Sequence, residues 1–415
     1  MKRILVLAIW IWASATARAE KAADWPQWGG PSRNATSPAV GVFGEGSVEL
    51  RELWRRPGDE GISALIVKAG RIFSLASAEG RHYAFALEAD TGEELWRLPL
   101  GESELEYGPA STPATDGRRV YLLSPGCKLL ALEAASGEQA WQLDFFAAYD
   151  IGPMRNGCWT SPILEDGRLV VQVNGAPDKL VVAFDKDSGE EVWSVAGTER
   201  AVRSSPSIAD LAGRRQVLVY DVTRDALGGV YGLDSRDGAV LWKHRFEDAD
   251  SFSFDLPIPL NENRLAVLTW NDIRAVEVGR EAEGGKTVQL WASRAVNAAL
   301  QPYNHHALYH DGHIYGFGDV FLVCLDAATG ATVWQEKTYG GSLILVDGHL
   351  VVLSEAAGLV RVVEATPRGY REKARLEVLN PGALANTPPS FAGRSIYLRN
   401  SEEIVALEVA EQGER

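Results

Sequence analysis

The sequence predicts an all-β protein folded as an eight-bladed β-propeller of four-stranded antiparallel blades. A turn followed by a tryptophan recurs along the chain, and a second kind of glycine turn recurs between its copies. The last unit lacks one strand, which the N-terminal region can supply. The chain has 415 residues, more than an average single domain holds, and a single domain of this size is typically built from repeats.

The first repeated element is a hairpin whose second strand carries a tryptophan four residues after the turn glycine. A segment of alternating apolar residues, such as 83–87, precedes each turn, and glycine accepts the positive φ that tight turns require. A sixth copy ends at Trp291 and has a longer acidic tip at 280–285. The five regular pairs are Gly92 and Trp96, Gly137 and Trp141, Gly189 and Trp193, Gly238 and Trp242, and Gly330 and Trp334.

The second repeated element is a short polar turn that leads into another strand, such as 120–123. Its eight copies divide the chain into eight units. Two hairpins per unit give four strands, which is the content of one propeller blade. The turns lie at 69–71, 116–118, 166–168, 212–214, 261–264, 311–313, 347–349 and 392–394.

The eighth unit predicts how the ring closes. It ends with the strand 404–409 and has no further turn or tryptophan strand. The missing strand is present at 48–54, so that Trp54 joins the tryptophan series. An open stack of sheets would leave the last edge bare, and we therefore expect the N-terminal strand to close the ring.

The first residues are typical of an export signal. Lys2 and Arg3 precede an apolar run at 4–13 that is too short to span a membrane, and Ala17-Arg18-Ala19 is typical of a cleavage site. We expect a periplasmic or secreted protein without a membrane span or lipid anchor. The predicted segments are a signal peptide at 1–19, an extension at 20–45, the propeller at 46–409 and a tail at 410–415.

The charge restricts the possible binding partners, and the cysteine content restricts the possible disulfide bonds and metal sites. Without residues 1–19 the chain has 38 basic and 56 acidic residues, a net charge of −18, and no basic stripe that would bind nucleic acid or anionic lipid. The three cysteines fit no zinc motif and are too few for a disulfide framework. A disulfide between Cys127 and Cys158 is one alternative, but we expect the cysteines to be small buried thiols.

The phrase Ala-x-Asp-x-x-Thr-Gly-x-x-x-Trp resembles the repeat of pyrroloquinoline-quinone (PQQ)-like propellers, and the resemblance covers 46–409. It implies eight blades, with each tryptophan docked against the neighbouring blade. The segments 24–31 and 363–370 resemble those of exported bacterial proteins with such repeats. Lys373 stands where the seventh tryptophan is expected, so one junction between blades should be built differently.

Three features suggest a ligand or metal site, but each has a structural explanation or unsuitable spacing. The tryptophans recur at one position per unit, which favours packing between blades over ligand stacking. The Asp-Thr-Gly turns lack the alternating oxygen ligands of a calcium loop. His305 would lie roughly 16 Å along a strand from His310, too far to share a metal ion, and His310 and His313 flank a turn. We therefore predict no metal site.

The channel mouth is the candidate ligand site, because the segments that precede the first strand of each blade should gather there. Polar residues beside proline recur in these segments. Either they simply begin the inner strands, or they form a pocket with aromatic, cationic and imidazole groups. The pocket would contain Arg155, Asn156, Trp159, Arg203, His305, His306 and Asn386.

The function expected from these features is a non-catalytic binding or scaffold protein of the cell envelope. The alternative is an oxidoreductase that uses PQQ or another ligand in the funnel. Quinoprotein dehydrogenases hold PQQ with calcium and a disulfide between adjacent cysteines, but this chain has no Cys-Cys pair or matching calcium segment. We thus predict no cofactor, and either envelope proteins or a small polar ligand as partners. A resemblance to the propeller lipoprotein of outer-membrane barrel assembly also implies protein partners, although the lipidation cysteine is absent.

Overall fold

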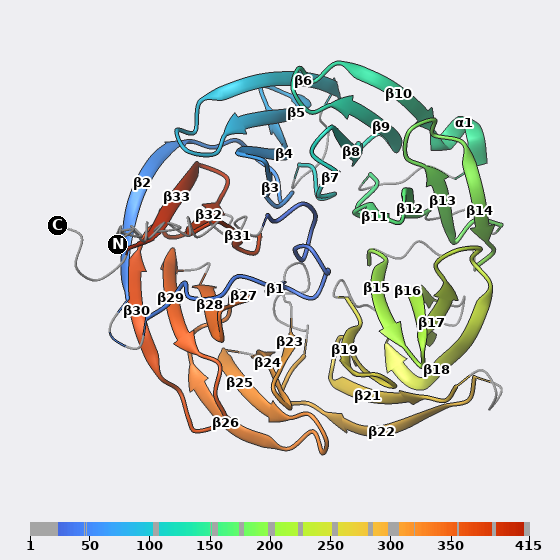
Figure 1. Cartoon of the computed structure of the whole chain (residues 1–415), viewed down its shortest axis with the longest axis vertical. Coiled ribbons are helices and arrows are strands. Elements are labelled where there is room, and N and C mark those ends of the chain that lie inside the picture. Colours follow the sequence, from blue (N-terminus) through green and yellow to red (C-terminus); the bar gives the residue numbers. More distant parts are fainter. Residues whose placement is uncertain are drawn as a thin grey trace, which may run out of the picture.

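The computed structural model confirms the predicted eight-bladed propeller. Eight antiparallel four-stranded sheets surround a central axis, and one of them gains a short fifth strand (Figure 1). The structure describes residues 24–44, 46, 48–102, 108–149, 151, 157–173, 178–197, 204–222, 227–250, 256–280, 285–297, 307–318, 320–354, 357–383 and 387–410; the side chains of 222, 227 and 247–250 are excepted.

Each blade runs from an inner strand at the channel to an outer strand at the rim. Blade 1 contains β3 (Ile66–Lys68), β4 (Arg71–Ala78), β5 (Arg81–Glu88) and β6 (Glu94–Glu102). Blade 2 contains β7 (Ala114–Thr115), β8 (Arg119–Leu123), β9 (Lys128–Glu133) and β10 (Gln139–Asp144), followed by the helix α1 (Phe145–Tyr149). Blade 3 contains β11 (Ile163–Glu165), β12 (Arg168–Gln172), β13 (Val181–Asp185) and β14 (Glu191–Val195). Blade 4 contains β15 (Ser207–Leu211), β16 (Arg214–Val222), β17 (Leu227–Asp234) and β18 (Val240–Asp250).

The second half of the ring repeats this order. Blade 5 contains β19 (Ile258–Asn261), β20 (Arg264–Leu268), β21 (Ile273–Val278) and β22 (Thr287–Ser293). Blade 6 contains β23 (Leu308–His310), β24 (His313–Gly318), β25 (Phe321–Asp326) and β26 (Thr332–Lys337). Blade 7 contains β27 (Ser342–Val346), β28 (His349–Ser354), β29 (Leu359–Glu364) and β30 (Glu372–Glu377), with β1 (Thr36–Ser37) parallel to β27. Blade 8 contains β31 (Ser390–Ala392), β32 (Ser395–Arg399), β33 (Glu403–Ala410) and β2 (Glu49–Pro57).

The core lies between the blades. The second and third strands are buried almost throughout, as in β4 and β5, because both of their faces pack against neighbouring sheets. Outer strands such as β6 alternate exposed and half-buried residues. Charged side chains on an outer strand discourage pairing with another chain at the edge of the blade.

Ring closure occurs as the sequence predicted. The N-terminal strand β2 pairs antiparallel with the C-terminal strand β33, from Glu49 opposite Ala410 to Pro57 opposite Glu403. Trp54 on β2 then donates its indole N–H to Ala89 O of blade 1 at 2.8 Å. Blade 8 is therefore completed by the start of the chain and docked to blade 1 like a regular blade.

Tryptophan docking between blades is confirmed at most junctions. The turn glycine lies flat against the indole: a Cβ on Gly92, whose φ is +72°, would lie 2.6 Å from the Trp54 ring. The positive φ of the glycine and its close approach to the indole thus both exclude any residue with a side chain at this position. Four more indoles donate to the next blade: Trp96 to Ala134 O, Trp141 to Lys186 O, Trp291 to Ala327 O and Trp334 to Thr366 O.

The junction between blades 4 and 5 departs from this pattern. Trp242 donates to Gln216 Oε1 of its own blade at 2.7 Å rather than to blade 5. The longer hairpin between β21 and β22, recognised in the sequence, places Gly285 near the Leu241 carbonyl instead of beneath an indole. Trp242 is still buried between the blades, as expected, in a cluster with Leu265, Val267 and Val276 of blade 5, and what differs is its hydrogen bond.

The expected position of the missing tryptophan is also corrected. Ala374, not Lys373, lies opposite Val362 at the position where Trp334 lies opposite Cys324. The turn before β30 is longer than in blade 1, so counting from its glycine misplaces the position; Lys373 lies in the bulge and pairs with Glu364 at 2.9 Å. The junction is built differently, as expected, because β33 and β2 are not joined by a turn that could receive an indole.

Candidate ligand site in the central channel

The N-terminal segment 24–43 crosses one end of the channel, as the blue chain at the centre of Figure 1 shows. Trp25 is buried and forms two backbone hydrogen bonds of 2.8 Å with Val67 of β3. Pro26 O accepts from Thr115 N of blade 2, and Gln27 Oε1 accepts from Leu164 N of blade 3. We call the segment 24–43 the floor, because it covers the ends of these inner strands.

The floor then continues to the opposite side of the ring. The short strand β1 pairs with β27, where Ala35 O accepts from Leu345 N at 2.7 Å. The backbone N–H groups of Val42 and Phe43 donate to the carboxylate of Asp347 in blade 7. The floor therefore joins blades 1, 2 and 3 to blade 7 across the channel axis.

Arg33 projects from the floor into the ring and is 1 % exposed. Its Nη1 donates to Pro162 O at 3.2 Å, and its guanidinium carbon lies 5.4 Å from the centre of the Trp28 ring. Neither Nε nor Nη2 has an acceptor within the described ranges. Burial lowers the pKa of Arg33 to about 9, so the side chain is still cationic at neutral pH.

Arg399 is the second fully buried arginine near the channel, and its surroundings are different. Its Nη1 donates to Ser63 O, Ser74 Oγ and Leu75 O, and its Nη2 donates to Asp59 O. Burial lowers its pKa to about 10. Arg399 therefore ties blade 8 to blade 1, whereas Arg33 makes one hydrogen bond to a described residue.

The serine and threonine residues before the inner strands form a chain of hydrogen bonds between blades. Ala64 N donates to Thr112 Oγ1, Thr112 N to Ser161 Oγ, and Ser161 N to Ser205 Oγ, at 2.8–2.9 Å. All three hydroxyl-bearing residues are buried. Each hydroxyl accepts from a backbone N–H group just before the inner strand of the preceding blade, which gives these residues a structural reason to recur.

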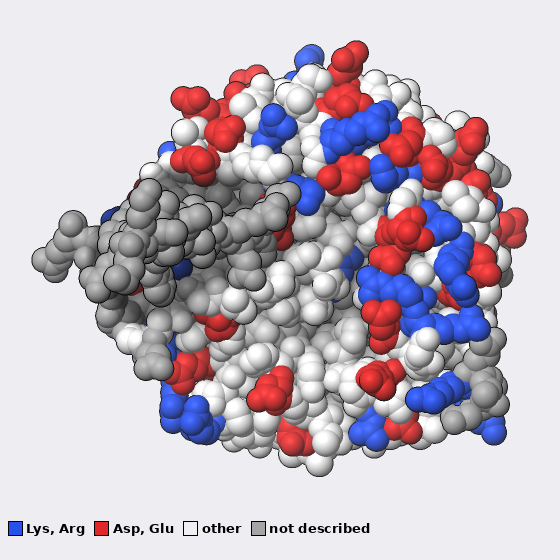
Figure 2. All heavy atoms as spheres, in the orientation of Figure 1, with Lys and Arg blue, Asp and Glu red and all other residues white. Residues whose placement is uncertain are grey.

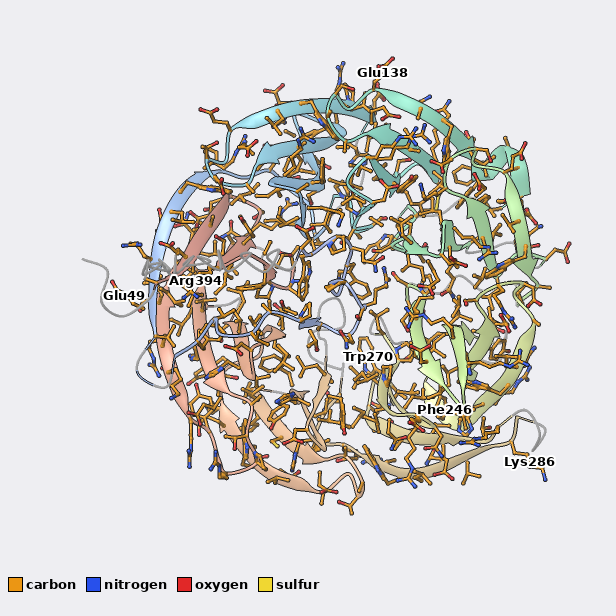
Figure 3. All side chains as sticks on the ribbon, viewed as in Figure 1. Glu49, Glu138, Phe246, Trp270, Lys286 and Arg394 are labelled. Carbon is orange, nitrogen blue, oxygen red and sulfur yellow. A yellow bond between two sulfur atoms is a disulfide. The ribbon has the colours of Figure 1, made fainter. Side chains whose placement is uncertain are left out.

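The predicted pocket residues are placed only in part. Trp159 is half-buried beside Cys158 and before the inner strand of blade 3. Trp270, which the sequence analysis missed, lies in a turn of blade 5 near the centre of the ring (Figure 3). The other six predicted residues, Arg155, Asn156, Arg203, His305, His306 and Asn386, lie outside the described residues.

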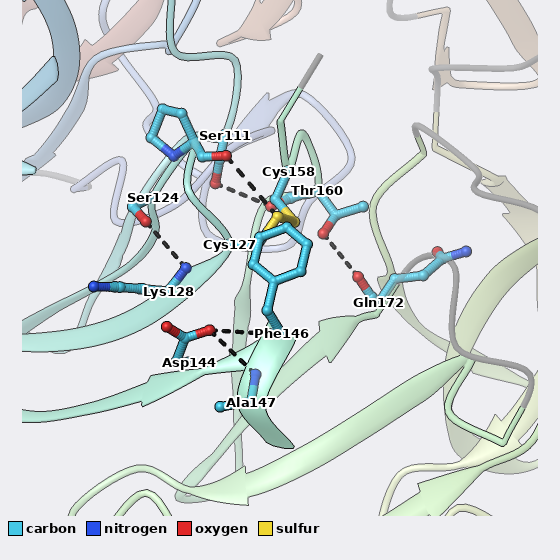
Figure 4. The surroundings of a disulfide bond; sticks show 11 residues. Ser111, Ser124, Cys127, Lys128, Asp144, Phe146, Ala147, Cys158, Thr160 and Gln172 are labelled. Carbon is cyan, nitrogen blue, oxygen red and sulfur yellow. Dashed lines mark hydrogen bonds between the residues drawn. A yellow bond between two sulfur atoms is a disulfide. The ribbon is translucent and has the colours of Figure 1, made fainter. Parts of the chain in front are cut away.

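Cys127 and Cys158 form a disulfide, so the expectation of free thiols is wrong for this pair (Figure 4). Cys127 lies in the turn between the second and third strands of blade 2, and Cys158 precedes the inner strand of blade 3. These two kinds of segment share one face of the ring, which places the Cα atoms 5.2 Å apart. The spacing of 31 residues alone does not reveal this contact. Cys324 is a buried free thiol, as expected.

The described histidines form no metal centre. His310 and His313 face each other across β23 and β24, and His313 Nδ1 lies 2.8 Å from Asp311 O. Desolvation lowers the pKa of half-buried His310. Within the described ranges, no three His, Cys, Asp or Glu side chains lie close enough to hold a metal ion.

A groove of about 600 Å³ lies between blades 4 and 5, on the face that the floor covers. Its charged walls are made of three arginines and three acidic residues: Arg214, Arg215, Arg280, Asp210, Glu262 and Glu277. Arg215 pairs with Glu165 at 2.8 Å, and the charges of the walls are balanced. In the view of Figure 2, acidic and basic side chains likewise alternate around the rim, and the surface near the centre is largely uncharged.

Comparisons with known proteins agree with this architecture. The family described as outer membrane protein assembly factor BamB matches residues 49–148 and 81–256, which together make up half of the chain. BamB of Shewanella oneidensis is 23 % identical over 299 residues, 65 % of this chain and 69 % of the relative. A polyvinylalcohol dehydrogenase of a Sphingopyxis species is 29 % identical over 135 residues, 28 % of this chain and 20 % of the enzyme.

Solved structures show the same fold at low sequence identity. BamB of Moraxella catarrhalis superposes with a TM-score of 0.62 at 16 % identity, covering 87 % of this chain and all of that one. A quinohemoprotein alcohol dehydrogenase of Pseudomonas putida gives a TM-score of 0.67 at 13 % identity, with coverages of 94 % and 81 %. The described residues contain no helix that is long and apolar enough to cross a membrane. The repeats, the closed ring and the match over half of its length show that the chain belongs to the PQQ-like propeller family described as outer membrane protein assembly factor BamB.

Proposed function

We propose that the protein is a non-catalytic scaffold that binds other proteins in the cell envelope. The observation that carries this proposal is the family match, together with the relative from Shewanella oneidensis, which is named as an assembly factor and aligns over about two thirds of both chains. The predicted signal peptide supports a periplasmic location. A propeller also offers a rigid rim and two faces for partners, whereas its fold by itself confers no reaction.

Photo-crosslinking in the native envelope tests this proposal. A photoreactive residue replaces one exposed side chain at a time around the rim, for example Leu53, Leu95, Val192 or Leu290. We expect adducts of one defined mass from adjacent positions, because a docked partner covers a continuous surface. The matched control places the same residue at Val40 of the floor, which is 71 % exposed. The absence of position-dependent adducts would contradict the scaffold function.

The second candidate is a quinone-dependent oxidoreductase, which the alcohol dehydrogenase and polyvinylalcohol dehydrogenase relatives favour. The disulfide joins two blades rather than adjacent cysteines, and the described residues hold no cluster of three or more His, Cys, Asp or Glu side chains, so neither feature supports this candidate. The test adds PQQ and Ca²⁺ to the purified protein and follows cofactor absorbance and dye reduction with alcohols. Saturable binding with turnover would replace the scaffold proposal.

A further inference from the structure

The floor makes the channel asymmetric, and Arg33 is the charged group that the floor brings inside. Gln27 contacts β11 at Leu164, whereas Arg33 contacts Pro162, two residues or about 7 Å further along the same wall. The guanidinium therefore lies above the floor, at the level where the inner strands begin. If Arg33 served only to attach the floor to the blades, all of its N–H groups would donate to acceptors in the floor or in the inner strands.

The donors that Arg33 leaves free are the two on one edge of the guanidinium. Nη1 is used by Pro162 O, while Nε and Nη2 have no acceptor among the described residues. Nε–H and Nη2–H point in parallel and match the two oxygens of a carboxylate or phosphate. A buried cation with this edge free is costly unless an acceptor is bound there.

Two further polar groups without partners lie on the adjacent blade. Ser161, next to Pro162, is hydrogen-bonded to Ser205 of blade 4. The hydroxyls of Ser204 and Ser207 on either side are buried and have no partner in the described part of the chain. By contrast, the hydroxyls of Ser111 and Ser161 are used in hydrogen bonds between blades 2 and 3.

We propose that Arg33 forms an oxyanion-binding site inside the channel, which receives a carboxylate or phosphate group through its Nε–Nη2 edge. Because the floor closes one end, the ligand enters from the face that carries the Cys127–Cys158 disulfide. This site is independent of the scaffold function: it requires a small acidic ligand, or an acidic group of a larger one, and no protein partner. The Trp28 ring beside the guanidinium holds the side chain in position.

The test follows the arginine Nε–H resonances of the ¹⁵N-arginine-labelled protein, residues 20–415, during titration with sodium acetate or with inorganic phosphate. Sodium chloride keeps the ionic strength constant. The Arg33 resonance is the one that Arg33→Lys removes; if this variant does not fold, Trp28→Phe identifies it by the changed ring current. We expect this resonance to shift saturably with one of the two anions. The Arg399 resonance should remain unchanged: its Nε also has no acceptor among the described residues, but its Nη2 already donates to Asp59 O, so Arg399 does not offer a free pair of parallel donors.

Thermal unfolding provides a second readout. An anion at 100 times its Kd should shift the folding equilibrium of the wild type about 100-fold, and this shift should be lost in Arg33→Met. The two titrations decide between a carboxylate and a phosphate. An Arg33 resonance that responds to neither anion would overturn the proposal, and so would equal stabilisation of the wild type and Arg33→Met.

Discussion

The ring is closed twice, and the two closures differ in kind. At the rim, β2 completes blade 8 by a regular backbone ladder and docks Trp54 on blade 1, as any blade docks on the next. At the channel, the floor has almost no regular structure and holds blades together through a buried tryptophan, isolated backbone hydrogen bonds and a buried arginine. The rim closure repeats the rule of the family, whereas the floor is specific to this end of the chain. The two closures should therefore respond differently to substitution.

The largest effect is expected in the floor. Trp25→Ala removes a fully buried indole that packs against blade 1 and leaves a cavity, at a cost of about 3–5 kcal/mol. Urea unfolding measures this loss of stability. Trp28→Ala is the matched control, since Trp28 is only half-buried and should cost clearly less. A loss in Trp25→Ala as small as that expected for Trp28→Ala would mean that the floor adds little to the closure of the ring.

The disulfide should have the next largest effect. It joins blades 2 and 3, which the floor also bridges, and replacing both Cys127 and Cys158 by alanine should cost about 2–4 kcal/mol by loosening the constraint on the unfolded chain. Unfolding with and without reductant measures this cost. Cys324→Ala should not change the response to reductant, because its thiol is free. A wild type that reductant does not destabilise would contradict a structural role for the bridge.

The contribution of indole docking to stability at the rim can be separated from that of backbone strain by comparing alanine substitutions at two glycines. Gly92 and Gly348 have similar φ values of +72° and +68°, but only Gly92 lies against an indole, that of Trp54. Both alanine variants are destabilised by the positive φ of the backbone. Gly92→Ala also pushes the indole away, so its free energy of unfolding should fall by about 1–3 kcal/mol more. Equal midpoints of thermal unfolding would show that indole docking does not depend on the glycine.

The smallest effect should be the acid sensitivity of blade 4. Hydrogen bonds from Arg236, followed by those from the backbone and Arg214, hold the pKa of Asp234 well below its usual range. A folded-state pKa below the unfolded value gives stability that is present above about pH 4 and is lost as the pH falls further. Asp234→Asn should therefore flatten the decrease in stability between pH 4 and pH 2. An unchanged pH profile would contradict this role of Asp234.

The parts of the molecule that repeat were predictable from the sequence. The turn glycines and tryptophans recur at fixed spacing, so the number of blades, the closing strand and the docking of Trp54 followed from counting. Counting from the turn glycine was wrong where the turn is longer: the turn before β30 moved the expected position from Ala374 to Lys373. The longer hairpin of blade 5 changed the hydrogen-bond partner of Trp242 but not its packing between the blades.

The channel could not be predicted in the same way, because its contacts join residues far apart in the sequence. Arg33 reaches Pro162, and Cys127 bonds Cys158, through the closure of the ring rather than through any local pattern. The sequence marked 24–31 as a signature but did not indicate that the segment crosses the channel. Of the predicted pocket residues, Trp159 is described, and the pocket itself stays a prediction.

The seam between β2 and β33 has a consequence for the order of the chain. Glu49 lies opposite Ala410, so the end of one strand and the beginning of the other are neighbours in an antiparallel pair. A short turn from Ala410 to Glu49, with the chain cut between the floor and β2, would convert blade 8 into a regular unit, and a second cut between two other blades would supply the new ends. Such a circular permutant would turn the floor into a separate segment, and would give the indole of a tryptophan at position 374 a turn to dock against.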